Sequence, residues 1–238
     1  MRGVGRTAWM EATHSESLDA SLLSLGRLDE AHLELGKQMF EAFGGAMYGM
    51  DLLAAGALNR SKAHIAGFRT LLEARNLICA GAILRLQLDT AMRFYAAFLV
   101  EQPHEFALAV LRGERVSDLR DRNGKKMTDA YLARRLGEEY EWVPRVYERT
   151  SGYVHLSSTH LMSALSPSEG TEADERLTIK ISAADKTLPD EIYVEAADAF
   201  RAATVVFLTY VQGWVFTKAN PELVQRWKKG RDAHERSV

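Results

Sequence analysis

The scarcity of proline constrains the fold of this chain more than any other feature of its sequence. Among 238 residues there are 5 prolines, and long stretches contain none. A proline inside a helix removes a backbone hydrogen bond and clashes with the preceding turn, so long proline-free stretches favour long helices. Apolar residues recur at helical period through several of these stretches. The sequence therefore predicts an all-α fold built from long antiparallel helices.

Capping and helix-breaking residues give the expected boundaries of these helices. One helix is expected from about residue 29 to about residue 58, with a weak middle at Gly44 and Gly45 and a boundary at 59–61. The apolar stretch that follows, to about residue 100, is either one long arm or two helices broken near Gly81. Further helices are expected at 106–111, at 129–136 after the capping residue Thr128, at 140–165 and at 190–220.

One short segment, within 176–182, alternates with the period of a β-strand. Leu177, Ile179 and Ile181 are apolar, and the residues between them are polar. The expected fold is therefore an all-α bundle with one minor β element. A single strand needs a partner, which a copy in a second subunit would supply. Together with the apolar surface of the long helices, this strand predicts a homodimer.

Composition favours one folded domain over 1–238, with a loose arm at 1–14 and a basic tail at 221–238. Hydrophobic residues make up 47% and charged residues 26% of the chain, which is ordinary for a globular domain. The formal net charge of -2 argues against a globally basic nucleic-acid binder, and a local basic patch stays open.

Cysteine usage and the N-terminal sequence favour a cytoplasmic location. The single cysteine, Cys79, cannot form an internal disulfide, and no secretory signal is recognised. The most apolar stretch, 202–216, is shorter than the roughly 20 residues of a membrane span. We expect it to be a buried helix, with no membrane contact.

The segment 149–155, Arg-Thr-Ser-Gly-Tyr-Val-His, carries the residue types that can cleave RNA without a metal ion. A histidine can move the proton of a ribose 2′-hydroxyl, because imidazole titrates near neutral pH. An arginine can hold the phosphate and stabilise the charge that builds on it. Arg149 and His155 are therefore the candidate catalytic pair. The supporting candidates are Ser151, Tyr153 and His160.

This segment resembles the hallmark of the HEPN superfamily, an arginine followed after four to six residues by a histidine on a helix late in the domain. The runs 67–73 and 151–155 are similar to an uncharacterised bacterial branch of these proteins, and the likeness extends loosely over 30–215. It implies a helical bundle in which two copies form one metal-independent ribonuclease site, with Arg149 and His155 as the catalytic pair. It also implies a toxin or phage-defence effector, with an antitoxin or another defence protein as partner.

The spacing of Arg149 and His155 limits how they can act together. Six residues along a straight helix correspond to about 600° of rotation, which leaves the two side chains about 120° apart. They can share one phosphate only through a bend, for example at Gly152, a long arginine reach or a second subunit. His160 lies about 20° from Arg149 on such a helix and shares its face better. The alternative is that this helix has a purely structural role. It would then bury a core face made of Val143, Val146, Tyr147, Thr150, Val154 and Leu161.

Two further sets of charged residues are candidates for phosphate or RNA contact. Arg85, Asp89 and Arg93 are spaced as i,i+4 pairs, which favours an ion-pair ladder at a helix seam over a phosphate pocket. The loop 112–126 is rich in basic residues and could follow an RNA backbone, although its acidic residues favour a solvated loop. Its RNA-binding candidates are Arg120, Arg122, Lys125 and Lys126. No metal-ligand spacing occurs, so we expect neither a metal nor a cofactor.

The leading hypothesis is a metal-independent ribonuclease of the toxin or phage-defence type. The alternatives are a non-catalytic HEPN-like interaction module and a small-ligand sensor that uses the set Arg85, Asp89 and Arg93. A nuclease needs Arg149 and His155 at an open cleft, whereas a scaffold buries or separates them. A sensor needs a closed pocket beside the middle helix.

Overall fold

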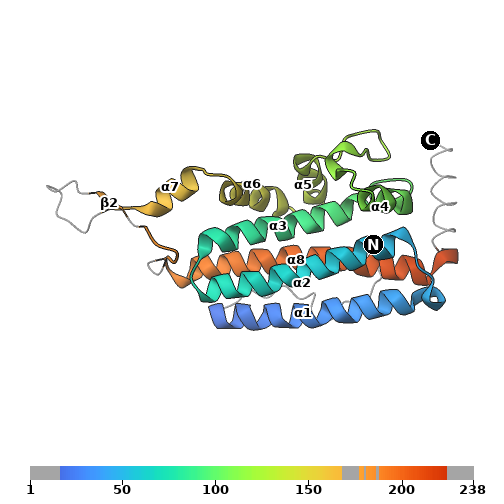
Figure 1. Cartoon of the computed structure of the whole chain (residues 1–238), viewed down its shortest axis with the longest axis horizontal. Helices are drawn as coiled ribbons and strands as arrows, with labels where there is room; N and C mark the ends of the chain where they lie inside the picture. Colours follow the sequence, from blue (N-terminus) through green and yellow to red (C-terminus); the bar gives the residue numbers. More distant parts are fainter. Residues whose placement is uncertain (1–16, 168–176, 180, 186–187, 224–238) are drawn as a thin grey trace.

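The chain folds as a bundle of long helices with a layer of shorter helices on one side (Figure 1). The computed structural model describes residues 17–167, 177–179, 181–185 and 188–223. The long helices are α1 (Leu18–Glu41), α2 (Gly49–Glu73), α3 (Leu77–Ala96) and α8 (Asp190–Ala219). The shorter elements are η2 (Ala42–Gly45), α4 (Pro103–Leu111), η3 (Val116–Asp118), α5 (Asp129–Gly137), α6 (Val143–Val154), α7 (Ser158–Ala164), β1 (Leu165–Pro167) and β2 (Leu177–Ile179). The predominantly helical character predicted from the sequence is confirmed.

The first helix begins and ends earlier than predicted. It starts at Leu18 rather than near residue 29, because the Ser17 side chain accepts a hydrogen bond from the Ala20 N–H at 3.2 Å and caps it. It ends at Glu41, before the two glycines that were expected only to weaken the middle of a longer helix. Gly44 and Gly45 adopt φ of 63° and 78°, in the left-handed region that glycine enters at no steric cost. The glycines therefore separate α1 from α2.

The boundary between α2 and α3 also differs from the prediction. α2 continues through 59–61, and Gly81 lies inside α3 rather than at a break. The turn is centred on Arg75, which has a φ of 57°. Asn76 then begins α3 by accepting a hydrogen bond from the Cys79 N–H at 3.0 Å. The apolar stretch to about residue 100 is therefore divided between two helices, and the turn between them lies before residue 77.

The last long helix of the bundle, α8, buries most of the apolar stretch 202–216, as predicted. It packs most extensively against α1 and α3. Phe200 stacks on Phe68 of α2 with ring centroids 4.1 Å apart, and Phe207 meets Phe94 of α3 edge-on. By length and composition alone α8 could cross a membrane. In this fold, 56% of its most apolar window is buried against the other helices.

The shorter helices form the covering layer, and two of the predictions for it need correction. The helix predicted at 106–111 is α4, and it begins earlier, at Pro103, because proline is well suited to the first turn of a helix. Thr128 caps α5, as predicted, by accepting from the Tyr131 N–H at 3.3 Å. The helix predicted over 140–165 is broken, because His155 takes an extended conformation with a ψ of 146°. α6 and α7 are therefore separate helices.

A short antiparallel hairpin projects from the end of the bundle beyond α7 (Figure 1). Leu165, Ser166 and Pro167 of β1 pair with Ile179, Thr178 and Leu177 of β2. The strand expected within 176–182 thus finds its partner in its own chain. The expectation that its partner comes from a second subunit is therefore wrong, and the homodimer itself stays a prediction.

A chain of buried hydrogen bonds ties four helices together through polar side chains. His32 of α1 bonds to Leu28 O through Nδ1 at 2.7 Å and to Ser61 Oγ through Nε2 at 2.8 Å. Because a carbonyl only accepts, Nδ1 carries the proton and the Ser61 hydroxyl donates to Nε2. Gln87 Nε2 donates to Ser61 Oγ at 2.7 Å and to Thr204 Oγ1 at 3.0 Å. These side chains are satisfied in the core and fix the register of α1, α2, α3 and α8.

A buried ion pair lies at the end of the bundle where α2 begins and α8 ends. Lys218 Nζ lies 3.1 Å from Asp51 Oδ2, and both side chains are fully buried. Lys218 also donates to Met39 O at 2.7 Å, and Trp214 Nε1 donates to Asp51 Oδ1 at 2.9 Å. Tyr48 N donates to Asp51 Oδ2 at 2.8 Å, which begins α2. Each charge therefore has hydrogen-bonding partners in place of water.

Candidate functional site

Arg149 lies on the face of α6 that turns toward α8. Its Nη1 donates to Glu195 Oε1 of α8 at 2.6 Å, and the two side chains are 62% and 57% exposed. This ion pair joins α6 to α8 at the surface. One carboxylate contact engages one of the five N–H donors of a guanidinium, so Arg149 keeps capacity for a second anion.

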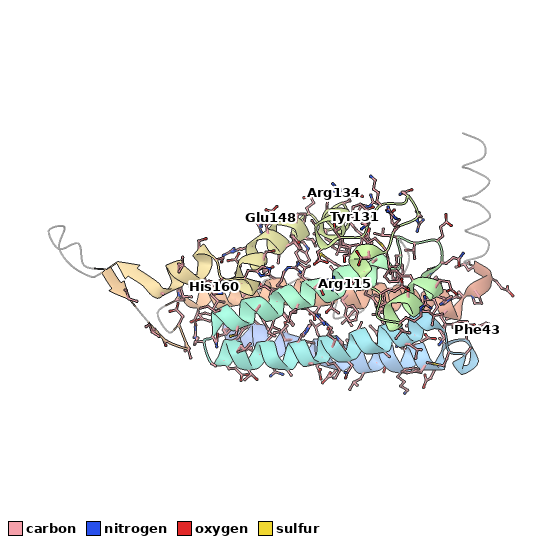
Figure 2. The ribbon with its side chains drawn as sticks, turned by 45° about the horizontal axis from the view of Figure 1, so that its top comes forward. Phe43, Arg115, Tyr131, Arg134, Glu148 and His160 are labelled. Atoms are coloured by element: carbon pink, nitrogen blue, oxygen red, sulfur yellow. The ribbon has the colours of Figure 1, made fainter. Side chains whose placement is uncertain are left out.

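Arg149, Tyr153 and His160 line one surface cavity of about 590 Å³, which we name the Arg149 cavity. Its other walls are the start of α3, the segment 181–185 and the beginning of α8. Figure 2 shows His160 at the end of the molecule from which the hairpin projects. The structure therefore brings together the predicted arginine and two of the three supporting candidates.

Glycine at position 81 allows Tyr153 to enter this site. A Cβ at Gly81 would lie 2.5 Å from Tyr153 Cγ, so only a hydrogen at this position leaves room for the ring. Burial raises the pKa of the Tyr153 phenol, and the nearby Arg149 opposes that rise. The phenol therefore stays protonated and can act as a hydrogen-bond donor at the wall of the cavity.

His160 is oriented by the break between α6 and α7. Ser157 N donates to His160 Nδ1 at 3.3 Å, which leaves Nε2 as the protonated nitrogen of the neutral ring. The Ser157 hydroxyl donates to Gly152 O at 2.7 Å and thereby closes the end of α6. The His160 ring also meets the Tyr153 ring edge-on, with centroids 6.4 Å apart. The straight-helix geometry used to relate His160 to Arg149 does not hold, yet both residues line the same cavity.

His155 lies elsewhere. It is the first residue after α6, it is exposed, and it is absent from the lining of the Arg149 cavity. Ser151 is also absent from that lining, and its hydroxyl donates to Tyr147 O at 2.7 Å inside α6. The two members of the predicted catalytic pair do not face one cavity within a single chain.

Exposed apolar side chains surround His155. Val154 is 49% exposed, Leu156 is 87% exposed and Leu161 is 61% exposed. Only part of the apolar face expected from the structural alternative is buried, namely Val143 and Thr150. The end of α6 and the start of α7 therefore present an apolar surface to the outside, which a purely structural helix does not require.

The set Arg85, Asp89 and Arg93 belongs to an ion-pair network, but only one of its two predicted i,i+4 pairs, Asp89 with Arg93, is formed among the described contacts. Arg93 Nε lies 2.6 Å from Asp89 Oδ1, and Arg93 Nη2 lies 3.1 Å from Asp129 Oδ1 of α5. Arg85 Nη2 lies 3.7 Å from Asp129 Oδ2, and its guanidinium lies 4.3 Å from the centre of the Tyr147 ring. The network clamps α5 and α6 onto α3.

The basic loop is more ordered than a solvated loop, and most of its predicted RNA-binding residues have structural partners. Arg122 donates to Leu99 O at 3.1 Å and to Phe98 O at 2.8 Å, which satisfies carbonyls beyond the end of α3. Arg120 donates to Gly124 O at 2.6 Å, and Lys126 lies 3.9 Å from Asp118. Lys125 is exposed, with no side-chain bond to any described residue.

Sequence reasoning missed the Lys218–Asp51 pair and the Arg149–Glu195 pair, because each joins residues far apart in the chain. The one available signal was the acidic residue Glu195 on the predicted last helix, which could pair with a basic residue of a neighbouring helix. Within the described ranges, no three His, Cys, Asp or Glu side chains gather closely enough to hold a metal ion.

Comparisons with protein-family models, with curated proteins and with solved structures found no match.

Proposed function

We propose that this protein is a metal-independent ribonuclease of the HEPN type. The observation that carries the proposal is the Arg149 cavity, where an arginine, a tyrosine and a histidine surround one opening. These groups match the needs of phosphodiester cleavage, which are a cation for the phosphate and a group that moves protons. A role as a toxin or phage-defence effector, with a defence protein as partner, belongs to the same proposal.

In the proposed reaction, the 2′-oxygen of the ribose attacks the adjacent phosphorus and the bond to the 5′-oxygen breaks. A base takes the 2′-hydroxyl proton and an acid gives a proton to the leaving oxygen, which yields a 2′,3′-cyclic phosphate and a 5′-hydroxyl. Arg149 holds the phosphate with some of its N–H donors while another donor stays bonded to Glu195. His160 supplies one proton-transfer group at the cavity.

His155 takes part in this proposal through a second copy of the chain. The exposed Val154, Leu156 and Leu161 flank it, and burying them between two copies would remove apolar surface from water. In such a homodimer, the His155 of one copy would complete the Arg149 cavity of the other. The second histidine would then supply the other proton transfer.

The test is cleavage of a single-stranded RNA by the purified chain in excess EDTA, with the ends of the products identified. We expect cleavage with 2′,3′-cyclic ends, and a loss of about 10²–10⁴-fold for His155→Ala and for His160→Ala. Arg149→Ala should also abolish cleavage, and Arg149→Lys should not restore it fully, because lysine lacks the bidentate fork. Arg134→Ala, on exposed Arg134 of α5, is the matched control and should cleave normally. Activity that requires added magnesium would contradict the mechanism.

A non-catalytic helical interaction module is the second candidate function. It is favoured by the engagement of Arg149 with Glu195 and by the position of His155 outside the cavity. It predicts no cleavage by the wild-type chain, and a lower melting temperature for Arg149→Ala through the lost contact between α6 and α8.

A further inference from the structure

A second cavity, of about 460 Å³, lies along the C-terminal half of α3. Its walls are α2, α3 and the segment that joins α4 to η3, and we name it the Arg115 cavity. The Arg149 cavity uses the opposite end of α3. Figure 2 shows the two regions apart, with Arg115 along the bundle and His160 toward the hairpin.

One side of the Arg115 cavity is charged, and its positive groups outnumber its negative ones. The lining includes Arg60, Arg93 and Arg115 against Asp89 and Glu114. Asp89 is shared, because Arg93 Nε lies 2.6 Å from one of its oxygens and Arg60 Nη2 lies 3.6 Å from the other. Arg93 Nη2 also lies 3.1 Å from Asp129 Oδ1 of α5, so Asp89 and Asp129 together hold these two guanidinium groups at the wall.

Arg115 adds a third cation that the fold does not use. Its side chain is exposed and makes no hydrogen bond or ion pair with any residue in the described part of the chain, although its carbonyl accepts from Asp118 N at 2.9 Å. The neighbouring Glu114 lies 3.3 Å from Arg112, so its charge is balanced by another arginine. The mouth of the cavity consequently favours an anion.

Another part of the lining of the Arg115 cavity is aliphatic and leaves open space. Leu52 and Leu111 line it and are 48% and 51% exposed, which leaves apolar surface at the opening. Gly56 of α2 also lines it, and a Cβ at that position would meet no atom within 4 Å. The helix surface is therefore bare at the point where a bound molecule could lie against the leucines.

We propose that the Arg115 cavity binds a small amphipathic anion, with a phosphate or carboxylate group attached to an aliphatic body of several carbons. Arginine pairs with either head group through parallel N–H bonds, and Arg60, Arg93 and Arg115 supply the donors. The aliphatic body covers Leu52 and Leu111. Both parts are needed, because Asp89 already competes for two of the arginines.

The ligand requirement is tested by isothermal titration of the full chain with hexyl phosphate, octyl phosphate, octanoate, inorganic phosphate and octanol. An alkyl phosphate or the carboxylate should bind, and the comparison of octyl phosphate with octanoate identifies the preferred head group. Affinity should rise about fourfold per added methylene from hexyl to octyl phosphate. Inorganic phosphate and octanol should bind about tenfold more weakly or not at all. Absence of binding by both octyl phosphate and octanoate would overturn the proposal.

Two matched pairs of variants test the location. Gly56→Leu fills the hollow and should weaken octyl phosphate binding about tenfold or more, whereas Gly67→Leu, at another open glycine of α2, should leave it unchanged. Arg115→Gln should also weaken binding about tenfold, and Arg27→Gln, on the exposed side of α1, should not. Equal behaviour within both pairs would place any binding elsewhere and overturn the proposal.

Discussion

Replacing Gly81 with alanine tests the packing that builds the Arg149 cavity. A Cβ at Gly81 would lie 2.5, 2.6 and 2.8 Å from Cγ, Cδ2 and Cδ1 of Tyr153. Carbon atoms pack at about 3.5–4.0 Å, so the Tyr153 ring or one of the two helices must move by about 1 Å. Overpacking of this kind costs about 1–3 kcal/mol of the free energy of unfolding.

Gly67 of α2 is the matched control, because a Cβ there would meet no atom within 4 Å. Alanine at either position gains about 0.8–1 kcal/mol of helix propensity over glycine. Gly67→Ala should therefore stabilise the protein by about 1 kcal/mol. Gly81→Ala should be neutral or destabilising by up to about 2 kcal/mol, since the clash offsets the same gain. The difference between the two variants isolates the cost of the clash.

Urea unfolding followed by far-UV circular dichroism measures this difference. The double variant Gly81→Ala/Tyr153→Ala removes the ring, so alanine at position 81 should then stabilise relative to Tyr153→Ala alone. If Gly81→Ala by itself stabilises the protein as much as Gly67→Ala does, Tyr153 does not pack on α3 and the wall of the Arg149 cavity is wrongly described.

Three other features give measurable predictions. Burial lowers the pKa of His32 and of His64 below the ordinary 6.5, so the unfolded chain binds more protons. The urea midpoint should be level above about pH 6.5 and fall as the pH drops from there to about 5, and a level midpoint throughout would contradict this. Lys218→Met leaves Asp51 buried without its cation and should lower the free energy of unfolding, measured in urea, by about 3–5 kcal/mol. A decrease below about 1 kcal/mol would contradict this reasoning. Leu156→Asp should shift the proposed homodimer toward monomer in sedimentation, and a wild-type chain that is monomeric at micromolar concentration would remove the composite site.

The sequence predicted a helix boundary that depends on an interaction between residues close together in the chain. The cap of α5 depends on Thr128 and a backbone N–H three residues later, and it was predicted. The turn at Arg75 was not predicted, because it is held by residues distant in sequence. Arg75 Nη1 lies 2.6 Å from Asp190 Oδ1 of α8, and Asp185 N of the segment 181–185 donates to Arg75 O at 2.9 Å. A break near Gly81 was one of two alternatives, and the role of this glycine was not predictable because its partner Tyr153 is distant in sequence.

The candidate site was predictable by residue type and not by arrangement. Arginine and histidine chemistry pointed to Arg149 and to the histidines around it, and Arg149 and His160 do line one cavity. The straight-helix geometry assumed a continuous helix, and the extended conformation of His155 interrupts it. The segment 181–185 and Glu195 complete the surroundings of Arg149 through long-range contacts that periodicity does not encode.

The packing of α8 against α1 has a consequence for the synthesis of this protein. Among the described helices, α1 is synthesised before the others and α8 after them, yet these two pack most extensively on each other, and Lys218 reaches a carbonyl 179 residues earlier in the chain. At about 5–20 residues per second, a ribosome needs on the order of 10–40 seconds to span that interval. Throughout it, the apolar faces of the early helices lack the helix that covers them. We therefore expect the nascent chain to bind chaperones until α8 emerges, and truncation within α8 should yield aggregated product.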